Sequence, residues 1–161
     1  MAVHNWEGNF FEDFTVGDVY RHQLGRTINE ADNTWFTLLT CNTLEVHFNA
    51  DYASRTEFGK PLVVSTLTLA VVTGLSVADI SRNAVANLAW DKIRLLKPVF
   101  IGDTLYAESE ILETRPSASR PGNGIVRVRS RGFNQHSETV IEYERTVLVY
   151  MRGARPAVTA G

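Results

Sequence analysis

The sequence predicts an α+β domain in which a curved antiparallel sheet wraps around one long buried helix. The longest uncharged stretch, residues 61–78, has the length of a helix. The part of the chain that follows it has the hydrophobic period of two that strands require. A chain of 161 residues suits one domain with one core, so both features belong to the same fold.

The uncharged stretch is predicted to be a core helix and not a membrane span. Ser, Thr and Gly recur in it too often for a lone span in lipid, whereas a helix inside a protein core tolerates them. Pro61 disfavours helix at Lys60. We therefore expect the helix to start with Ser65 as its N-cap and to run to about Ile80.

Three shorter elements are predicted before this helix. Residues 18–27 have the pattern of a strand, residues 29–40 that of an amphipathic helix, and residues 51–57 that of a second short helix. The apolar residues of the first helix share one face: Ala31, Trp35, Leu38 and Leu39.

Four antiparallel strands are predicted after the helix, over residues 85–96, 104–112, 124–133 and 138–151. Turn sequences such as Gly102-Asp103 separate them. With the early strand they complete a single hotdog domain over residues 1–152. Residues 153–161 are rich in Gly, Ala, Arg and Pro, so we expect a flexible C-terminal tail.

Composition excludes several classes of function. The 16 Lys and Arg against 18 Asp and Glu give a net charge of −2, which favours neither nucleic acid nor a membrane surface as partner. The single cysteine, Cys41, and four scattered histidines predict neither a disulfide nor a metal site. The first residues lack the pattern of a signal peptide, so we expect a cytoplasmic protein. No Gly-rich phosphate loop is present, which argues against nucleotide hydrolysis and hydride transfer.

His47 is the histidine that its flanking sequence singles out. It follows Asn42 by five positions and precedes the run Phe58-Gly59-Lys60-Pro61 before the buried helix. This pattern resembles the MaoC-like hydratases and dehydratases of acyl-CoA thioesters, whose motif is an acid or amide, four residues, then histidine, followed by FG-x-P. Further runs, among them Phe10-Phe11-Glu12-Asp13-Phe14 and Asn87-Leu88-Ala89-Trp90-Asp91, are similar to the mesaconyl-CoA hydratase (β-methylmalyl-CoA dehydratase) subgroup over nearly the whole chain.

The resemblance implies a hydro-lyase acting on a short branched enoyl-CoA, with coenzyme A as part of the substrate and no separate cofactor. The chain departs from the family pattern at three places: Asn42 replaces the usual Asp, Leu44-Glu45 the usual Asn-Pro, and Val64-Ser65 the usual His-Gly. An amide cannot titrate, whereas an imidazole exchanges protons near neutral pH. We therefore expect a one-base mechanism, in which His47 shuttles the proton and Asn42 orients the water.

The thioester oxygen needs fixed hydrogen-bond donors. The first turn of a helix supplies free backbone N–H groups and the positive end of the helix dipole. We expect the backbone around Val64, Ser65 and Thr66 to form this oxyanion site, with Gly59 beside it.

The rest of the substrate is assigned to two further pairs of residues. Asn87 and Trp90, on a strand beside the helix, are expected to line the acyl pocket, with plain core as the alternative for Trp90. Arg115 and Arg120 bracket a Pro/Ser loop and are expected to bind the phosphates of coenzyme A, with simple solvent exposure as the alternative.

Two other functions remain open. A hotdog thioesterase would need a carboxylate to activate water, which Glu45 or Asp51 would have to supply. A catalytically weak acyl-CoA-binding homologue would fit the substitutions at Asn42, Leu44 and Glu45. The alternative for Asn42 alone is a residue that ends a helix in the left-handed conformation. Because a single hotdog leaves a sheet edge unpaired, we expect a homodimer in each case.

Overall fold

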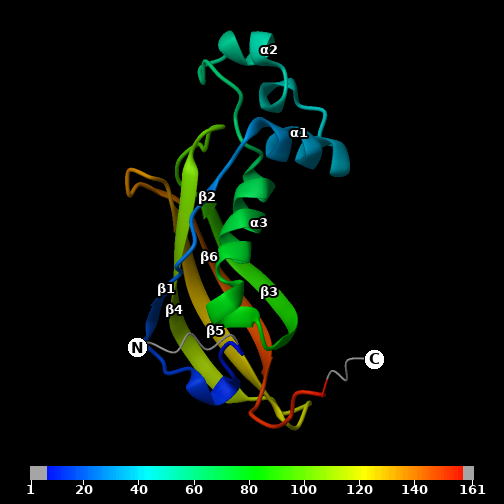
Figure 1. The fold of residues 1–161 in the computed structure, drawn as a ribbon, viewed down its shortest axis with the longest axis vertical. Helices are drawn as coiled ribbons and strands as arrows, with labels where there is room; N and C mark the ends of the chain where they lie inside the picture. Colours follow the sequence, from blue (N-terminus) through cyan, green and yellow to red (C-terminus); the bar gives the residue numbers. More distant parts are fainter. Residues whose placement is uncertain (1–6, 158–161) are drawn as a thin grey trace.

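The computed structural model describes residues 7–157 and confirms the predicted α+β hotdog arrangement. Its antiparallel sheet has the strand order β1-β4-β5-β6-β3, with β2 also paired to β4, and the helix α3 lies along one face (Figure 1). The strands are β1 (Val19–Arg21), β2 (Arg26–Thr27), β3 (Ala84–Leu95), β4 (Thr104–Pro116), β5 (Asn123–Phe133) and β6 (Thr139–Tyr150). The helices are α1 (Glu30–Leu39), α2 (Ala50–Ser54) and α3 (Ser65–Leu75), with short turns η1 (Phe11–Asp13), η2 (Glu45–His47) and η3 (Val77–Ser81).

The buried helix differs from its prediction at both ends. Leu62 bridges Phe100 and the N–H of Val63 donates to the carbonyl of Val99 at 2.8 Å, so the chain stays extended up to Val64. Val64 is therefore the N-cap, and Ser65 is the first helical residue. At its other end α3 stops at Leu75 and continues as the π-helical turn η3. Among the helices of residues 7–157, none has the length and hydropathy needed to cross a membrane.

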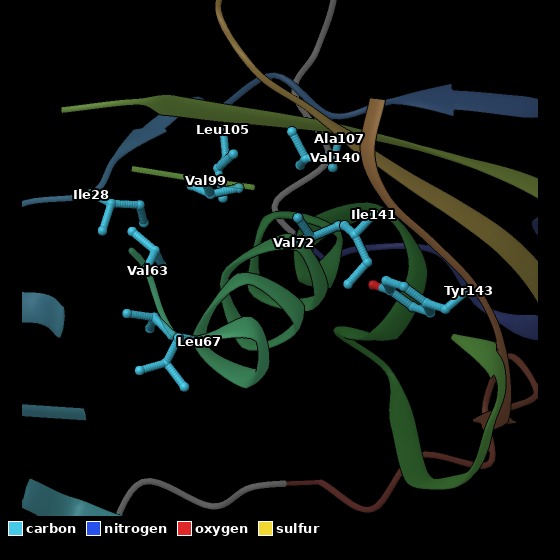
Figure 2. Close-up of a cluster of buried hydrophobic side chains, with 11 residues drawn as sticks. Ile28, Val63, Leu67, Val72, Val99, Leu105, Ala107, Val140, Ile141 and Tyr143 are labelled. Atoms are coloured by element: carbon cyan, nitrogen blue, oxygen red, sulfur yellow. The ribbon is translucent and has the colours of Figure 1, made fainter. Parts of the chain in front are cut away.

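The main core lies between α3 and the sheet. Figure 2 shows Val72 of α3 directed at the sheet, beside Ile141 of β6, and the same buried cluster includes Leu67 of α3 and Leu105 of β4. Val72, Leu105 and Ile141 are all fully buried. Burying large aliphatic side chains is the principal stabilising term in such a fold, so this contact fixes where α3 stands against the sheet.

The helix α1 turns its apolar stripe outward. Trp35 is 64% exposed and Leu39 is 78% exposed, whereas the buried residues of α1 are the polar Asn33 and Thr37. The predicted periodicity of α1 is therefore present, but its apolar face does not pack on this chain's own core. The polar face is buried instead, against the segments that contain His47 and Leu62.

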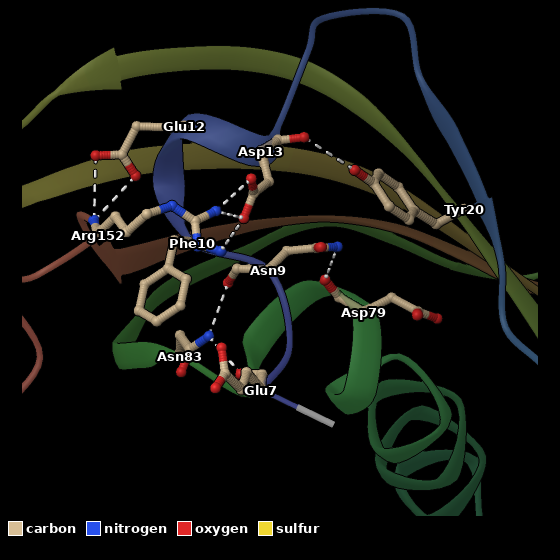
Figure 3. A network of polar contacts seen from close by, with 9 residues as sticks. All are labelled: Glu7, Asn9, Phe10, Glu12, Asp13, Tyr20, Asp79, Asn83 and Arg152. Carbon is tan, nitrogen blue, oxygen red and sulfur yellow. Dashed lines mark hydrogen bonds and ion pairs between the residues drawn. The ribbon is translucent and has the colours of Figure 1, made fainter. Parts of the chain in front are cut away.

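The two ends of the described chain are joined to each other, and the N-terminal end is also joined to Asn83, just after η3. The backbone N–H of Arg152 donates to the carboxylate of Glu12, and its guanidinium pairs with Asp13 at 2.6 Å (Figure 3). In the same figure, the Nδ2 atom of Asn83 donates to the carbonyls of Glu7 and Asn9. Of the predicted tail, residues 153–157 are exposed and residues 158–161 lie outside the described residues. Residues 1–6, part of the N-terminal stretch to which the signal-peptide prediction applies, also lie outside them.

Candidate active site

His47 ends the short turn η2 and is only 7% exposed. Its Nδ1 atom lies 2.8 Å from the carbonyl oxygen of Leu62. A carbonyl oxygen only accepts, so Nδ1 must carry the proton and donate. The lone pair of the neutral ring is therefore on Nε2, which is the form that a general base requires.

A second buried side chain, Asn33 of α1, joins the segments around His47. It is fully buried; its Nδ2 donates to the carbonyls of His47 and Leu62 at 2.8 and 3.1 Å, and its Oδ1 accepts from the N–H of Val64 at 2.9 Å. No motif in the sequence marks this residue. The structure therefore adds Asn33 to the candidate site as a residue that sequence reasoning missed.

The hydrogen bond from the N–H of Val64 to Oδ1 of Asn33 changes which residues can form the predicted oxyanion site. Because the N–H of Val64 already donates to Asn33, it is not free to bind a thioester oxygen, and the prediction for Val64 is wrong. Ser65 and Thr66 follow as the first two residues of α3 and are exposed. Their N–H groups have no acceptor within a helix, so the positive end of α3 remains available through these two residues.

A cleft of about 260 Å³ opens beside the first turn of α3. It is lined by Phe58, Leu62, Val63, Ser65, Thr68 and residues 95–99. Leu62 lines the cleft while its carbonyl oxygen holds the imidazole of His47, and Ser65 lies on the same cleft. His47 itself is not among the lining residues; its ring is linked to the cleft through the carbonyl of Leu62. A largely apolar cavity beside a helix start is a typical arrangement for a small-molecule site.

Gly59 is not among the residues that line this cleft. Its φ of +68° is in the left-handed region, and its N–H donates to the carbonyl of Thr56 at 3.1 Å. Glycine adopts this backbone without strain, so Gly59 shapes the turn that carries Phe58 to the cleft.

Asn42 lies half-buried in the connection from α1 to η2. Its Oδ1 accepts from the N–H of Leu44 at 3.1 Å, which fixes the side-chain amide in a local turn. The left-handed residue after α1 is Cys41, with a φ of +54°, and not Asn42, so that alternative for Asn42 is wrong. Within residues 7–157, no hydrogen bond joins Asn42 to His47.

The structure does not bring Asn87 and Trp90 to the cleft. Both are exposed on β3, Trp90 by 41%, and β3 is the edge strand of the sheet. The alternative that Trp90 is core is wrong too. Sequence periodicity located the strand correctly but did not reveal that this strand lies at an edge.

Arg115 and Arg120 lie at the far end of the sheet from His47. The bridge between Leu62 and Phe100 places His47 near the start of β4, whereas Arg115 is near the end of this 13-residue strand. At about 3.3 Å per residue, the length of β4 separates the two places by roughly 40 Å. Figure 1 shows the β4–β5 turn and α2 at opposite ends of the molecule. Arg115 also pairs with Glu113, at 3.2 Å.

The carboxylates considered for a thioesterase are exposed and engaged locally. Glu45 accepts from Nδ2 of Asn49 at 3.1 Å, and Asp51 pairs with Arg55 one turn away in the chain. Nothing in the structure directs either group toward the cleft. No cluster of three or more His, Cys, Asp or Glu side chains that could hold a metal ion occurs within the part of the chain that the structure describes.

His22 is the other buried histidine, and it belongs to the core. Its side chain is 0% exposed, and its ring nitrogens contact Asp79 Oδ2 at 2.6 Å and Ser109 Oγ at 3.0 Å. Burial lowers its pKa, and the hydrogen bond that its ring donates to the Asp79 carboxylate opposes this only in part. The folded protein therefore favours the neutral ring.

This pKa shift predicts a loss of stability in mild acid. The unfolded chain takes up the proton near the ordinary histidine pKa of about 6.5, whereas the folded chain does so only at lower pH. The free energy of unfolding should fall as pH drops below about 6.5, and His22→Asn should reduce this fall. Urea unfolding at pH 7.5 and 5.5 measures it, with exposed His136→Asn as the matched control. Equal pH dependence in wild type and His22→Asn would contradict the assignment.

Comparisons with known proteins bear on what this site does. A family model described as mesaconyl-CoA hydratase matches residues 2–161. The chain is 37% identical over 151 residues to a mesaconyl-CoA hydratase from Cereibacter sphaeroides, covering 93% of this chain and 44% of that protein. It is 37% identical over 152 residues to a β-methylmalyl-CoA dehydratase from Chloroflexus aurantiacus, covering 94% of this chain and 43% of that protein. The chain thus spans less than half the length of these curated relatives.

Solved structures give the same picture of the fold. A putative MaoC domain protein dehydratase from Chloroflexus aurantiacus superposes with a TM-score of 0.88 at 34% identity, over 99% of this chain and 46% of that chain. A Mycobacterium tuberculosis protein described as a double hotdog fold superposes with a TM-score of 0.83 at 22% identity, over 94% of this chain and 47% of that chain. The latter likeness shows the fold alone.

Proposed function

The chain belongs to the mesaconyl-CoA hydratase family, and on that premise we propose that it adds water to, or removes water from, the α,β double bond of a short branched enoyl-CoA thioester. The names of the relatives favour a substrate of the mesaconyl-CoA or β-methylmalyl-CoA type. The observation that carries the proposal is the buried His47, whose ring bonds to the carbonyl of Leu62, a residue that lines the cleft beside α3.

In the hydration direction, His47 acts as base and then as acid. Its Nε2 lone pair takes a proton from water as the water oxygen bonds to the β-carbon, and the electron pair of the double bond moves toward the thioester oxygen. The N–H groups of Ser65 and Thr66 stabilise the charge on that oxygen. The imidazolium then returns its proton to the α-carbon, which restores the neutral ring and completes the addition of one water.

Asn42 is assigned the orientation of the attacking water. Its Oδ1 is already held by the N–H of Leu44, which leaves the Nδ2 hydrogens to donate to a water oxygen. An amide donor orders the water without competing for its proton, so the proton passes to His47. This is the one-base mechanism that the replacement of Asp by Asn42 requires.

The complete binding site is assigned to two subunits. The edge strand β3 exposes four large apolar side chains: Leu88, Trp90, Ile93 and Leu95. An unpaired edge with such residues is normally covered, and the relatives are about twice as long as this chain. We assign the covering unit to a second copy of this chain. A second copy is also required if Arg115 and Arg120 are to reach coenzyme A bound near His47.

Light scattering on the purified chain tests the dimer. The expected mass is that of two chains, and a mass of one chain at micromolar concentration would contradict it.

An ultraviolet assay of enoyl-thioester absorbance, with mesaconyl-CoA and a panel of short enoyl-CoAs, tests the function. The absorbance is expected to fall while free thiol stays constant. Release of thiol would indicate a thioesterase instead, and tight binding without any change in absorbance would indicate an acyl-CoA-binding protein without turnover.

A further inference from the structure

We propose that Asn33 is a positioning residue for the reaction. Its side-chain amide sets where the imidazole of His47 stands relative to the first turn of α3, although it touches neither the water nor the thioester. The proposal rests on the proposed function, because it is His47 at this turn that does the chemistry there.

The three hydrogen bonds of Asn33 use every group that its amide has at this place. The two Nδ2 hydrogens go to the carbonyls of His47 and Leu62, at 2.8 and 3.1 Å, and Oδ1 accepts from the N–H of Val64, at 2.9 Å. These partners lie 14, 29 and 31 residues away along the chain. One fully buried side chain therefore ties α1, η2 and the start of α3 to one another.

The contact with Leu62 reaches the imidazole itself. The carbonyl of Leu62 accepts from both Asn33 and Nδ1 of His47, at 3.1 and 2.8 Å, while the N–H of Leu62 donates to Val46 at 3.0 Å. Asn33 thus holds the oxygen that keeps the proton on Nδ1 and leaves Nε2 as the base. The hydrogen bond from Nδ1 of His47 to the fixed carbonyl of Leu62 sets both the orientation of the ring and its tautomer.

The contact with Val64 reaches the other half of the site. By accepting the N–H of the N-cap residue, Asn33 fixes the point at which α3 begins. The next free N–H groups are then those of Ser65 and Thr66. Because the Asn33 side chain holds both the base His47 and the start of α3 with its oxyanion donors, a small displacement of Asn33 changes the distance between base and donors. Misplacement of catalytic groups by about 1 Å can cost about 100-fold in rate.

Only a carboxamide supplies two donors and one acceptor in this shape. A carboxylate has acceptors alone, so Asn33→Asp directs oxygen atoms at the carbonyls of His47 and Leu62. The chain offers a matched control in Asn83, which is 1% exposed and whose Nδ2 also donates to two main-chain carbonyls (Figure 3). The carbonyl of Asn83 accepts from the N–H of Tyr150, at the end of the sheet where Arg115 lies and away from His47.

Steady-state kinetics on these variants test the proposal. Asn33→Asp is expected to lower kcat by about 100-fold with a much smaller change in KM, while Asn83→Asp keeps the wild-type kcat although it unfolds at lower temperature. In a His47→Ala background, Asn33→Asp should cause a much smaller further loss, because the part of its effect that passes through the imidazole is already gone and only the part that passes through the start of α3 remains. Wild-type kcat in Asn33→Asp, or an equal loss in both backgrounds, would overturn the proposal.

A second variant and a second measurement cover the other outcomes. If Asn33→Asp does not fold, Asn33→Ser, which introduces no charge, takes its place with the same expectations. If the wild type hydrates no enoyl-CoA, the proposed function fails. Nitrogen NMR of the His47 ring then tests, without substrate, whether Asn33 positions that ring. The ring should lose its Nδ1–H tautomer in the Asn33 variant and keep it in Asn83→Asp; an unchanged ring in both would overturn the positioning role.

Discussion

Replacing His47 by alanine is expected to lower kcat for enoyl-CoA hydration by between about 100-fold and about 10⁴-fold, which is the range that a general acid–base group contributes. The loss should be this large because Asn42 and the neighbouring main-chain groups cannot take up a proton at neutral pH. KM should change much less, since the cleft and the N–H groups of Ser65 and Thr66 remain.

His47→Asn separates chemistry from structure. Its side-chain amide can still donate to the carbonyl of Leu62 in place of Nδ1, but it is not a base. We expect it to be as inactive as His47→Ala and closer to wild type in unfolding temperature. The exposed His136→Ala serves as the surface control. Folded His47→Ala with wild-type turnover would show that another group moves the proton.

Gly132→Ala is expected to destabilise the fold by about 1–3 kcal/mol, the usual cost of an overpacked core. A Cβ at this position on β5 would lie 2.4 Å from Val72 Cγ2 and 2.8 Å from Ile141 Cγ2. Val72 and Ile141 are fully buried, so neither can move aside without disturbing the contact between α3 and the sheet.

Gly74→Ala on α3 is the matched control for this change. A Cβ at Gly74 meets nothing within 4 Å, and the position is helical, so the substitution should stabilise by about 0.5–1 kcal/mol. Urea unfolding of both variants gives the comparison. If Gly132→Ala were as stable as wild type, α3 would not pack against the sheet as closely as the structure has it.

Periodicity predicted most of the fold, because each strand and helix has its own local pattern. The start of α3 was missed by one residue because its cap depends on the bond between Val64 and Asn33, which are 31 residues apart. The apolar stripe of α1 was recognised, but a period defines a face and does not say what covers it. The stripe is exposed because the opposite face of α1, which carries Asn33 and Thr37, is the buried one.

The part of the site that a sequence motif marks could be predicted from the sequence. The part whose position depends on the length of a strand could not. The motif around His47 singled out its imidazole, which the structure buries and bonds to the carbonyl of Leu62, three residues before α3 begins. Arg115 was assigned to coenzyme A because it brackets a Pro/Ser loop together with Arg120, whereas β4 runs to Pro116 and carries the arginine to the far end of the sheet. Asn33 could not be predicted from the sequence because all its partners are main-chain groups, which leave no pattern of side chains.

A crystal structure of His47→Asn with mesaconyl-CoA bound tests most directly whether one imidazole and the first turn of α3 act on the same thioester. The account predicts the thioester oxygen about 3 Å from the N–H of Ser65 or Thr66, with the β-carbon facing residue 47. A thioester bound with its oxygen away from the start of α3, and its double bond out of reach of residue 47, would contradict it.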